Sequence, residues 1–336
     1  MTLKEIAEQT GYSIATVSRV LNGTGNSKKN SKSYIEISEF ARMNGYSRSQ
    51  KPSGLVATIV PDISNPITTA IIKTIQSICD KEGLSLIIVN TNESAEQESN
   101  ALRHLTKLDL YGVIYSPASE SKSIDFISYK SGHRNVRAPV VLIGRELSFA
   151  NYDSVYINNK AGAFDATKYL LKKGCRDIAV IAGPKDTKPG RERLEGFLEA
   201  HAYFDLTVRP DRILFGDFTT SSGYYQTKAI LRSGDLPQAI IPMNNLMTRG
   251  CYQALMEAKI SVGMGEGKMA MVSFDGDELL EAMGVELPYI KRPTTEMGRI
   301  AMNLLFSRAG AANQNAPIQR IELSPILSIP NTKEYK

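Results

Sequence analysis

After residue 54, apolar runs alternate with polar or amphipathic segments along most of the chain. Eight runs have the length and the aliphatic content of buried strands: LVATIV, LSLIIV, GVIY, PVVLIG, DIAVIAG, RILFG, QAIIP and MAMVSF. Each is followed by a segment with helix-like spacing, an order typical of a parallel, doubly wound α/β sheet. Eight strands exceed one such sheet, so we expect two similar lobes, over about residues 55–155 and 156–288. We expect the chain to recross between them near residues 289–293 and again near Ile318.

The first 45 residues have a different pattern, in which three short helical periodicities replace the strands. Thr2 with Glu5, and Ser33 with Glu36, have the spacing of a capping box and predict the beginnings of the first and third helices. The expected apolar faces are Leu3, Ile6 and Ala7, then Val17, Val20 and Leu21, then Ile37, Phe40, Ala41 and Met43. The expected helix ends are Gly11, Gly23 and Gly45.

The second of these helices has a polar outer side that a buried helix does not need. Ser13 can cap it, and Thr16, Ser18, Arg19 and Asn22 are left outside. Short helices joined by a glycine turn are typical of a helix-turn-helix, whose second helix enters the major groove of DNA. There, hydroxyl, guanidinium and amide groups meet phosphates and base edges. The sequence therefore predicts a DNA-binding head.

Charge is distributed unevenly along the chain. Residues 1–51 contain eight Lys or Arg against four Glu, so most of the net charge of +5 lies in this N-terminal segment. Basic side chains gain affinity for a polyanion by releasing its counterions. Taken by itself, the same charge is also compatible with an ordinary solvated surface.

The composition limits the class of protein. A hydrophobic content of 42% with 22% charged residues is typical of globular domains. The sequence has neither a long apolar span nor a signal-peptide pattern, so we expect a cytoplasmic protein without a membrane partner. The cysteines Cys79, Cys175 and Cys251 are far apart and predict neither disulfides nor a zinc site.

The segment LKEIAEQTGYSIATVSRVLNG closely resembles the N-terminal signature of the lactose-repressor (LacI/GalR) family of bacterial transcription regulators. The resemblance continues through VPDISNP, GRERLEGF and SFDGDELL and covers almost the whole chain. It implies a two-lobed, periplasmic-binding-protein-like effector domain behind the head, and a homodimer that represses transcription by binding double-stranded operator DNA. It also implies control by a small ligand. GPKDTKPGRER and FGDFTTSSGYY look most like the sucrose and fructose repressors, which favours a sugar or sugar phosphate.

The resemblance assigns roles in the head residue by residue. It implies phosphate-contacting or helix-anchoring roles for Ser13, Thr16, Ser18 and Asn22, and base-reading roles for Ile14, Ala15 and Arg19. We expect residues 1–47 to form the head, 48–54 a linker and 55–336 the effector-binding and dimerisation domain.

The linker is shorter than the family pattern. Family members usually carry a hinge helix there that inserts a leucine into the minor groove, whereas this chain has only SRSQKPSG, with Pro52 and Gly54 as poor helix formers. We therefore expect no hinge helix, and phosphate contacts from Arg48 and Lys51 instead.

Candidate effector-binding residues follow from the sheet. In doubly wound sheets ligands bind at the carboxyl ends of the strands. The polar residues expected there are Asp62, Asn65, Arg145, Arg193, Asn244 and Asp275. By resemblance, Arg193 binds sugar hydroxyls or a carboxylate, while Asn244 and Asp275 are cleft residues. Solvated turn residues are the alternative.

Three details bear on this assignment. The chain departs from the family pattern at Asn245, where Asp is usual, and at Gly144, where many members have Asp before Arg145. Beside the expected cleft, Lys185, Lys188 and Arg191 would suit a phosphate, or form a solvated loop.

The segments that resemble enzyme motifs do not have the residue spacing or the context that those motifs require. GPKDTKPGR lacks P-loop spacing, GMGEGK runs into a strand rather than a helix, and no GxSxG elbow occurs. His104, His133 and His201 have no metal-ligand spacing. We therefore expect no catalytic residue, metal or cofactor. The alternative function is a solute-binding sensor with weak or lost operator binding, and the sequence leaves induction and corepression both open.

Overall fold

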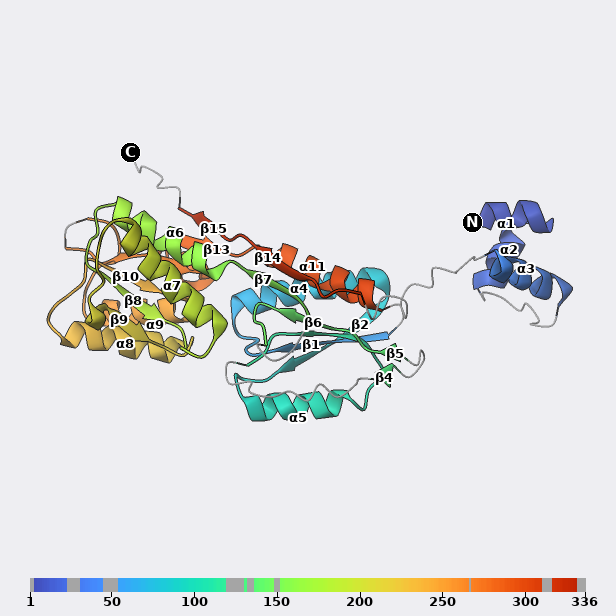
Figure 1. Cartoon of the computed structure of the whole chain (residues 1–336), viewed down its shortest axis with the longest axis horizontal. Helices are drawn as coiled ribbons and strands as arrows, with labels where there is room; N and C mark the ends of the chain where they lie inside the picture. The colour runs from blue at the N-terminus through green and yellow to red at the C-terminus, as the bar shows by residue number, and fades with distance from the viewer. Residues whose placement is uncertain are drawn as a thin grey trace. The chain divides into compact units, whose positions relative to one another are not determined.

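The structure is a computed structural model, and it describes residues 3–22, 31–44, 54–118, 130–131, 136–147, 152–265, 267–309 and 316–330. The chain divides into two compact units, Met1–Ser53 and Gly54–Lys336, each with its own hydrophobic core (Figure 1). Within the described ranges, no helix is both long enough and apolar enough to cross a membrane.

The described residues of the first unit form the helices α1 (Leu3–Thr10), α2 (Ile14–Asn22) and α3 (Lys32–Met43). Its core consists of Ile6, Ala7, Val17, Val20, Ile37 and Ala41. Gly11 follows α1 with a φ of 72°, a left-handed conformation that glycine adopts without strain. The expected capping of α2 is confirmed, because Ser13 Oγ accepts a hydrogen bond of 3.1 Å from the amide of Thr16.

Two predictions for α3 were wrong. The helix begins at Lys32, and its cap is Ser31, whose Oγ accepts from the amide of Tyr34 at 3.3 Å. The predicted Ser33–Glu36 box is therefore absent, and Glu36 instead accepts a 2.7 Å hydrogen bond from the Tyr12 hydroxyl.

Met43 is 79% exposed rather than part of the apolar face. It follows the buried Ala41 by two residues, a rotation of about 200° around the helix that turns it away from the core. Thr2, Gly23 and Gly45 lie outside the described residues.

The first lobe of the second unit has a six-stranded parallel sheet in the order β14-β7-β6-β3-β1-β2. The strands are β1 (Gly54–Val60), β2 (Leu84–Asn90), β3 (Leu110–Tyr115), β6 (Val140–Ile143), β7 (Asp153–Ile157) and β14 (Arg320–Leu323). A small antiparallel pair, β4 (Lys130–Ser131) and β5 (Val136–Arg137), lies outside this sheet.

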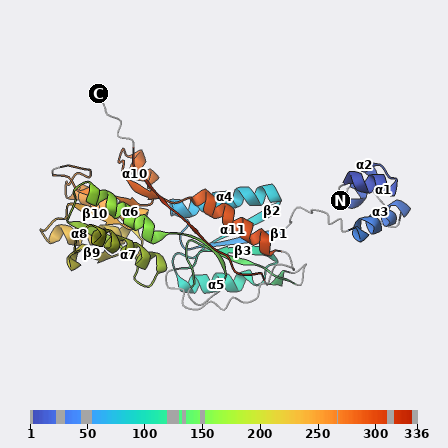
Figure 2. The same cartoon turned by 45° about the horizontal axis from the view of Figure 1, so that its top comes forward.

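Helices cover both faces of that sheet, as Figures 1 and 2 show. On one face α4 (Pro66–Glu82) packs beside α11 (Thr294–Arg308), and on the other lies α5 (Ala95–Leu105). The period-two alternation of β1 explains this arrangement, since Val56 belongs to the core under α4 while Ala57 and Ile59 pack with the leucines of α5.

The second lobe repeats the plan. Its parallel sheet has the order β11-β10-β8-β9, and a three-stranded sheet β12-β13-β15 lies beside it. The strands are β8 (Ile178–Ala182), β9 (Ile213–Phe215), β10 (Ala239–Pro242), β11 (Ala270–Met271), β12 (Ser273–Phe274), β13 (Tyr289–Lys291) and the antiparallel β15 (Ile326–Ser328). In Figure 1, α6 (Asn159–Lys172) and α7 (Lys188–Tyr203) lie on one side, and α8 (Thr220–Arg232) and α9 (Asn245–Glu257) on the other. Two short helices complete the lobe, η1 (Pro210–Arg212) and α10 (Glu278–Ala282).

The predicted fold class is confirmed: an α/β chain with N-terminal helices and two lobes built on parallel sheets. All eight predicted strand runs form strands. The chain passes between the lobes after β7, after β13 and between β14 and β15, so the last crossing lies after Leu323 rather than near Ile318. The reason is that β14 pairs with β7 and extends the first sheet before the chain leaves it.

Candidate functional site

A cleft of about 350 Å³ lies between the two lobes of the second unit. Its walls are residues that follow the carboxyl ends of β1, β3 and β6 in the first lobe, and of β9, β10 and β13 in the second, together with side chains of α4, α7 and α11. This is where doubly wound sheets bind ligands, because the loops there leave the sheet in opposite directions and open a crevice.

Five of the six residues that the sequence predicted at the effector site line this cleft. Asp62, Asn65, Arg145, Arg193 and Asn244 all line it. Asp275 does not, and lies behind Arg292, which does.

Arg193 is the most deeply buried cation of the cleft, with 3% of its surface exposed. Its Nε donates to Asn159 Oδ1 at 2.9 Å, Nη1 donates to the carbonyl of Met243, and its guanidinium carbon lies 3.8 Å from the centre of the Phe274 ring. Burial lowers the pKa of Arg193 well below its ordinary value, and the charge of Arg292 lowers it further. Within the described part of the chain Arg193 has no ion pair, so its charge is available to ligand oxygens.

Arg292 is held by a bidentate ion pair with Asp275. Nε and Nη2 of Arg292 lie 2.5 and 2.6 Å from the two carboxylate oxygens, and Asp275 is 1% exposed. Asp275 also has a φ of 76°, which is strained for a residue with a side chain and is typical of functional positions. Asp275 is therefore a positioning residue that fixes the Arg292 guanidinium at the cleft wall.

Two further arginines of the cleft are neutralised by their own carboxylates. Arg145 pairs with both oxygens of Glu93 at 2.9 and 2.6 Å and donates to the carbonyl of Pro117 at 2.8 Å. Arg249 pairs with Asp277 at 3.1 and 3.2 Å. These pairs hold rigid donor groups without adding net charge to the cleft.

The two asparagines of the cleft are also helix caps. Asn65 Oδ1 accepts from the amide of Ile67 at 3.0 Å, and Asn244 Oδ1 accepts from Met247 at 2.8 Å while its Nδ2 donates to the carbonyl of Phe218 at 2.8 Å. They order α4 and α9 at the edge of the cleft. Asp62 has a similar local role, since its Oδ1 accepts from both the amide and the hydroxyl of Ser64.

The basic residues at the beginning of α7 and in the loop before it are not arranged as expected for a phosphate site. Lys185 lies over the Phe215 ring at 4.0 Å, and Arg191 donates to backbone carbonyls of its own turn. Lys188 pairs with Glu146. None of the three lines the cleft, and of this segment's cations only Arg193 enters it.

Polar contacts join the two lobes beside the cleft. Lys188 on α7 forms its ion pair with Glu146, which follows β6 of the first lobe. On the α4 side, Asn245 Nδ2 lies 3.4 Å from Asn65 Oδ1. Asn245 is fully buried, and its Oδ1 has no hydrogen-bond partner among the described residues.

Several cleft residues were missed by sequence reasoning, above all Arg292, Phe218 and Asp217. Arg292 obeys the strand-end rule that identified the others, but β13 is only three residues long and was expected only as a crossing. Phe218 has a φ of 70° and its ring lies within 6 Å of both Arg145 and Arg193, which no sequence pattern indicates.

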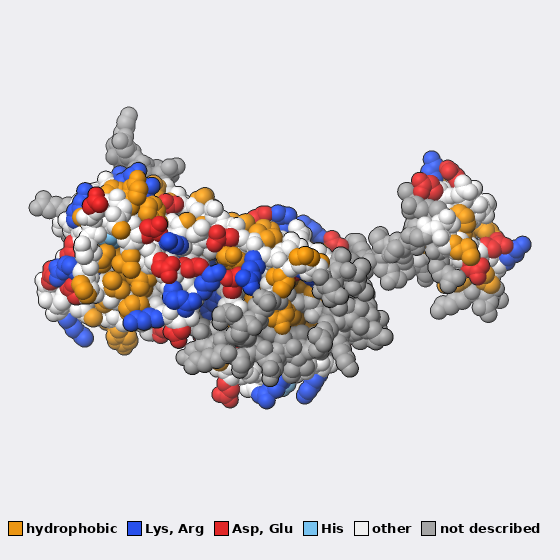
Figure 3. Space-filling model, in the orientation of Figure 1, with side chains coloured by type: hydrophobic (Ala, Val, Ile, Leu, Met, Phe, Trp, Pro, Cys, Tyr) orange, Lys and Arg blue, Asp and Glu red, His pale blue; other side chains and the backbone are white. Residues whose placement is uncertain are grey.

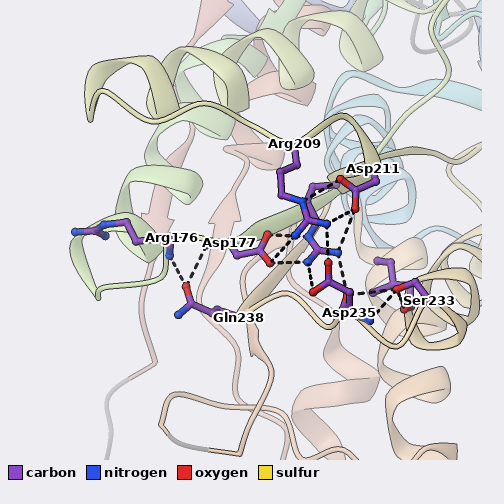
Figure 4. A network of polar contacts seen from close by, with 9 residues as sticks. Arg176, Asp177, Arg209, Asp211, Ser233, Asp235 and Gln238 are labelled. Atoms are coloured by element: carbon purple, nitrogen blue, oxygen red, sulfur yellow. Dashed lines mark hydrogen bonds and ion pairs between the residues drawn. The ribbon is translucent and has the colours of Figure 1, made fainter.

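A second polar cluster lies away from the cleft, at the amino ends of β8 and β10. Figure 4 shows Asp177, Arg209, Asp211 and Asp235 facing one another, with Gln238 accepting from the amide of Arg176. The 3% exposed side chain of Arg212 also belongs to it, since Nη2 and Nε lie 2.5 and 2.7 Å from Asp177. These contacts join η1 to the starts of two strands, so the cluster stabilises the lobe rather than forming a site.

In the first unit, the outer side of α2 is available to a partner. Ile14 is 51% exposed, and Ala15 and Arg19 are also exposed. Arg19 Nε donates to the carbonyl of Ala15 at 3.2 Å, and Ser13 Oγ lies 2.9 Å from Thr16 Oγ1. The side chain of Asn22 lies outside the described structure, as do Arg48, Lys51 and the rest of the linker up to Ser53.

Charged side chains of both signs lie on the surface of the second unit. Figure 3 shows acidic and basic side chains mixed over the visible described face of Gly54–Lys336. Among the described residues, no group of three His, Cys, Asp or Glu could hold a metal ion, and all three cysteines are buried and free.

Comparisons with known proteins agree with this architecture. Residues 167–329 match the family model of a periplasmic binding protein-like domain. The ribose operon repressor of Halalkalibacterium halodurans is 27% identical over 314 residues, which covers 91% of this chain and 90% of the repressor. The structure also resembles that of the transcriptional regulator CelR in complex with cellobiose, with a TM-score of 0.68, 24% identity and 98% of each chain covered.

The whole-chain similarity extends to a protein solved on DNA. The lac repressor dimer bound to operator and an anti-inducer has a TM-score of 0.67, 20% identity and 97% coverage of both chains. Over most of its length the chain is thus similar to curated transcriptional repressors, at 26 to 28% identity. These relatives are named as a ribose operon repressor and as the HTH-type transcriptional repressor PurR, the latter from Histophilus somni.

Proposed function

We propose that this protein is a transcriptional repressor of carbohydrate genes, which binds operator DNA as a homodimer and is controlled by a sugar or sugar phosphate in the interlobe cleft. The observation that carries the proposal is the cleft itself: one buried, unpaired arginine, Arg193, lies among arginines already neutralised by carboxylates. The same chain carries a three-helix head of the helix-turn-helix type.

The chemistry of the cleft suits a polyhydroxylated ligand. Fixed guanidinium groups donate hydrogen bonds, and the oxygens of Asp62 and Asp217 accept them. The Phe218 ring offers an apolar surface for the carbon face of a sugar ring. A phosphate or carboxylate on the ligand would lie against Arg193 and Arg292, where charge-assisted hydrogen bonds are strong. This ligand class includes the sugars and sugar phosphates that the resemblance to the sucrose and fructose repressors favours.

The DNA contacts we propose come from α2. Ile14, Ala15 and Arg19 read bases, while Ser13, Thr16, Ser18 and Asn22 contact phosphate or anchor the helix, with Arg48 and Lys51 adding phosphate contacts. One head reads one half-site, so two copies are needed for a two-fold operator. Such a protein acts in the cytoplasm, where bacterial DNA lies. The resemblance to a lac repressor dimer on operator supports the proposed binding of DNA by two copies of the chain.

A thermal-shift screen over sugars and sugar phosphates, followed by gel shifts on DNA selected from a random library, tests the proposal. A ligand that binds only the folded protein raises its melting temperature, by an amount that grows with concentration over Kd. We expect at least one sugar or sugar phosphate to do so and to change operator affinity. Ligand binding without any specific DNA complex would favour the second candidate, a sensor that has lost operator binding.

A further inference from the structure

The charged groups of the cleft, taken together, do not make it positive. Among the described residues, four arginines line it, and neither a lysine nor a histidine does: Arg145, Arg193, Arg249 and Arg292. Five carboxylates accompany them, three in the lining and two behind it as partners of arginines: Asp62, Glu93, Asp217, Asp275 and Asp277. Four arginines and five carboxylates give these residues a net charge of −1.

The ion pairs show where the uncompensated charges lie. Three of the arginines each have a carboxylate partner. Within the described part of the chain, three charged side chains of the lining form no ion pair: Arg193, Asp62 and Asp217. A ligand in the cleft therefore meets one guanidinium and two carboxylates whose charges the protein itself does not neutralise.

The two unpaired carboxylates occupy the same turn in the two lobes. Asp62 is the second residue after β1, and Asp217 is the second residue after β9. In each turn the aspartate Oδ1 accepts from the amide and the hydroxyl of the residue two positions on, at 2.8 and 2.7 Å for Ser64 and at 2.9 and 2.6 Å for Thr219. Asp62 is half-buried and Asp217 is exposed, so a ligand can reach a carboxylate from each lobe.

Asp217 is ionised at neutral pH. Burial raises the pKa of its carboxyl group, but hydrogen bonds from Thr219 and Ser222 outweigh burial and hold the pKa below its ordinary value. An ionised carboxylate accepts hydrogen bonds and donates none. Asp217 therefore suits a ligand hydroxyl and repels a phosphate group, whose charge is about −1.5 to −2 at pH 7.

We propose that the effector is a neutral sugar rather than a sugar phosphate, and that Asp217 is a specificity-determining residue that accepts a hydrogen bond from a sugar hydroxyl. The inference rests on the sugar effector proposed above and narrows it. Sugar hydroxyls both donate and accept, so they satisfy Asp62, Asp217 and Arg193 together. A phosphate dianion leaves one negative charge after pairing with Arg193, and that charge faces two carboxylates without counter-ions.

Isothermal titration calorimetry with matched sugars tests the preference. The pairs differ only in a phosphate: D-fructose and fructose 6-phosphate, D-glucose and glucose 6-phosphate, and D-ribose and ribose 5-phosphate. For a pair that binds, we expect the unmodified protein to bind the neutral sugar at least about tenfold more tightly. Added salt should raise the affinity for the phosphate and leave that for the neutral sugar unchanged, because salt screens a repulsion between charges. A phosphate excluded by size alone would show no such increase.

The Asp217→Asn variant tests the residue, since it removes the charge and keeps an oxygen that can accept from Thr219. Its affinity for the neutral sugar should fall by about fivefold, because a neutral acceptor replaces a charged one. The preference over the phosphate should fall to about twofold or less. Asp62→Asn makes the same change in the first lobe and should act in the same direction. The matched control is Asp205→Asn, an equal change of charge at an exposed residue outside the cleft, which should alter neither affinity.

The outcomes separate this inference from the proposed function. A sugar phosphate that binds the unmodified protein more tightly than its parent sugar, with an affinity that falls as salt rises, contradicts the neutral sugar and leaves a sugar-type effector in place. An unchanged preference in Asp217→Asn contradicts the role of Asp217. If neither the sugars nor their phosphates bind, the proposed effector class fails, and this inference fails with it.

Discussion

At the scale of single residues, the cleft depends on charges that are fixed before any ligand arrives. Arg145, Arg249 and Arg292 each have a carboxylate partner, so the protein holds these donors in place rather than leaving the ligand to order them. Arg193 differs because its burial is compensated by neutral groups and an aromatic face only. It is the position at which ligand charge should matter most.

Replacing Asp275 with asparagine tests this organisation. The change breaks the bidentate pair and leaves Arg292, with its side chain 15% exposed, without its counter-charge. Breaking a buried pair typically costs about 3 kcal/mol of folding stability. We expect lower stability in denaturant melts and loss of the effector's influence on DNA binding, with ligand-free operator affinity intact, since a ligand acts only through contacts that differ between states. Normal effector affinity in calorimetry would contradict the positioning role.

In the head, Arg19 is the residue whose replacement is most informative. It is exposed on the outer side of α2 and contributes nothing to the three-helix core. Arg19→Ala should weaken operator binding by about 1 to 3 kcal/mol and relax one base preference, without lowering the melting temperature. Replacement of Lys4, an exposed residue of α1, serves as a control for loss of charge alone. Equal operator affinities for Arg19→Ala and the unmodified protein in gel shifts would remove Arg19 from the interface.

At the scale of elements, the second lobe is held at its amino-end edge by the cluster of Figure 4. A hydrogen bond from Arg209 lowers the pKa of both Asp211 and Asp235. A carboxyl group with a depressed folded-state pKa stabilises the fold above its unfolded pKa of about 4, and that contribution is lost as the pH falls through the folded value.

The pH dependence of melting tests this contribution. Between about pH 6 and pH 3, the unmodified protein should lose more melting temperature than Asp235→Asn, whose amide cannot titrate. The two proteins should therefore differ most near neutral pH and converge in acid. Parallel curves over the whole range would show that the cluster contributes no pH-dependent stability.

The strands differ in how well the sequence predicted them. Runs such as DIAVIAG are apolar on both faces, as buried parallel strands must be, and all eight were identified. The strands β7 and β14 were missed because DSVYI and RIEL mix polar residues into short, outer positions of the sheet. Their pairing, which joins residues 153–157 to 320–323, depends on the tertiary fold.

The residues of the candidate site were also predicted only in part. Residues placed by the strand-end rule line the cleft, because that rule depends only on local sequence and sheet geometry. Asp275 was predicted as a wall residue, yet its side chain turns to Arg292, seventeen positions along the chain.

At the scale of the whole molecule, a short segment joins the N-terminal helices to the two-lobed second unit. Residues 47–54, SRSQKPSG, contain a proline and a glycine and reach at most about 28 Å when extended. We predict binding through major-groove and phosphate contacts, with a steep dependence on salt and little DNA bending. Circular-permutation gel shifts on a selected operator measure the bend. A pronounced bend at the operator centre would contradict the prediction and indicate a minor-groove wedge from the linker region.

The central claim is that the cleft and the head are coupled, and one titration tests it most directly. Fluorescence anisotropy of labelled, selected operator DNA gives the affinity of the full chain with and without a saturating amount of the sugar found by thermal shift. A coupling free energy of about 1 to 3 kcal/mol predicts that the sugar changes operator affinity by about 5- to 150-fold, in either direction. The Asp275→Asn variant should show no such change. Specific operator binding that stays the same within about twofold at saturating sugar would contradict the account, because the two sites would then be independent.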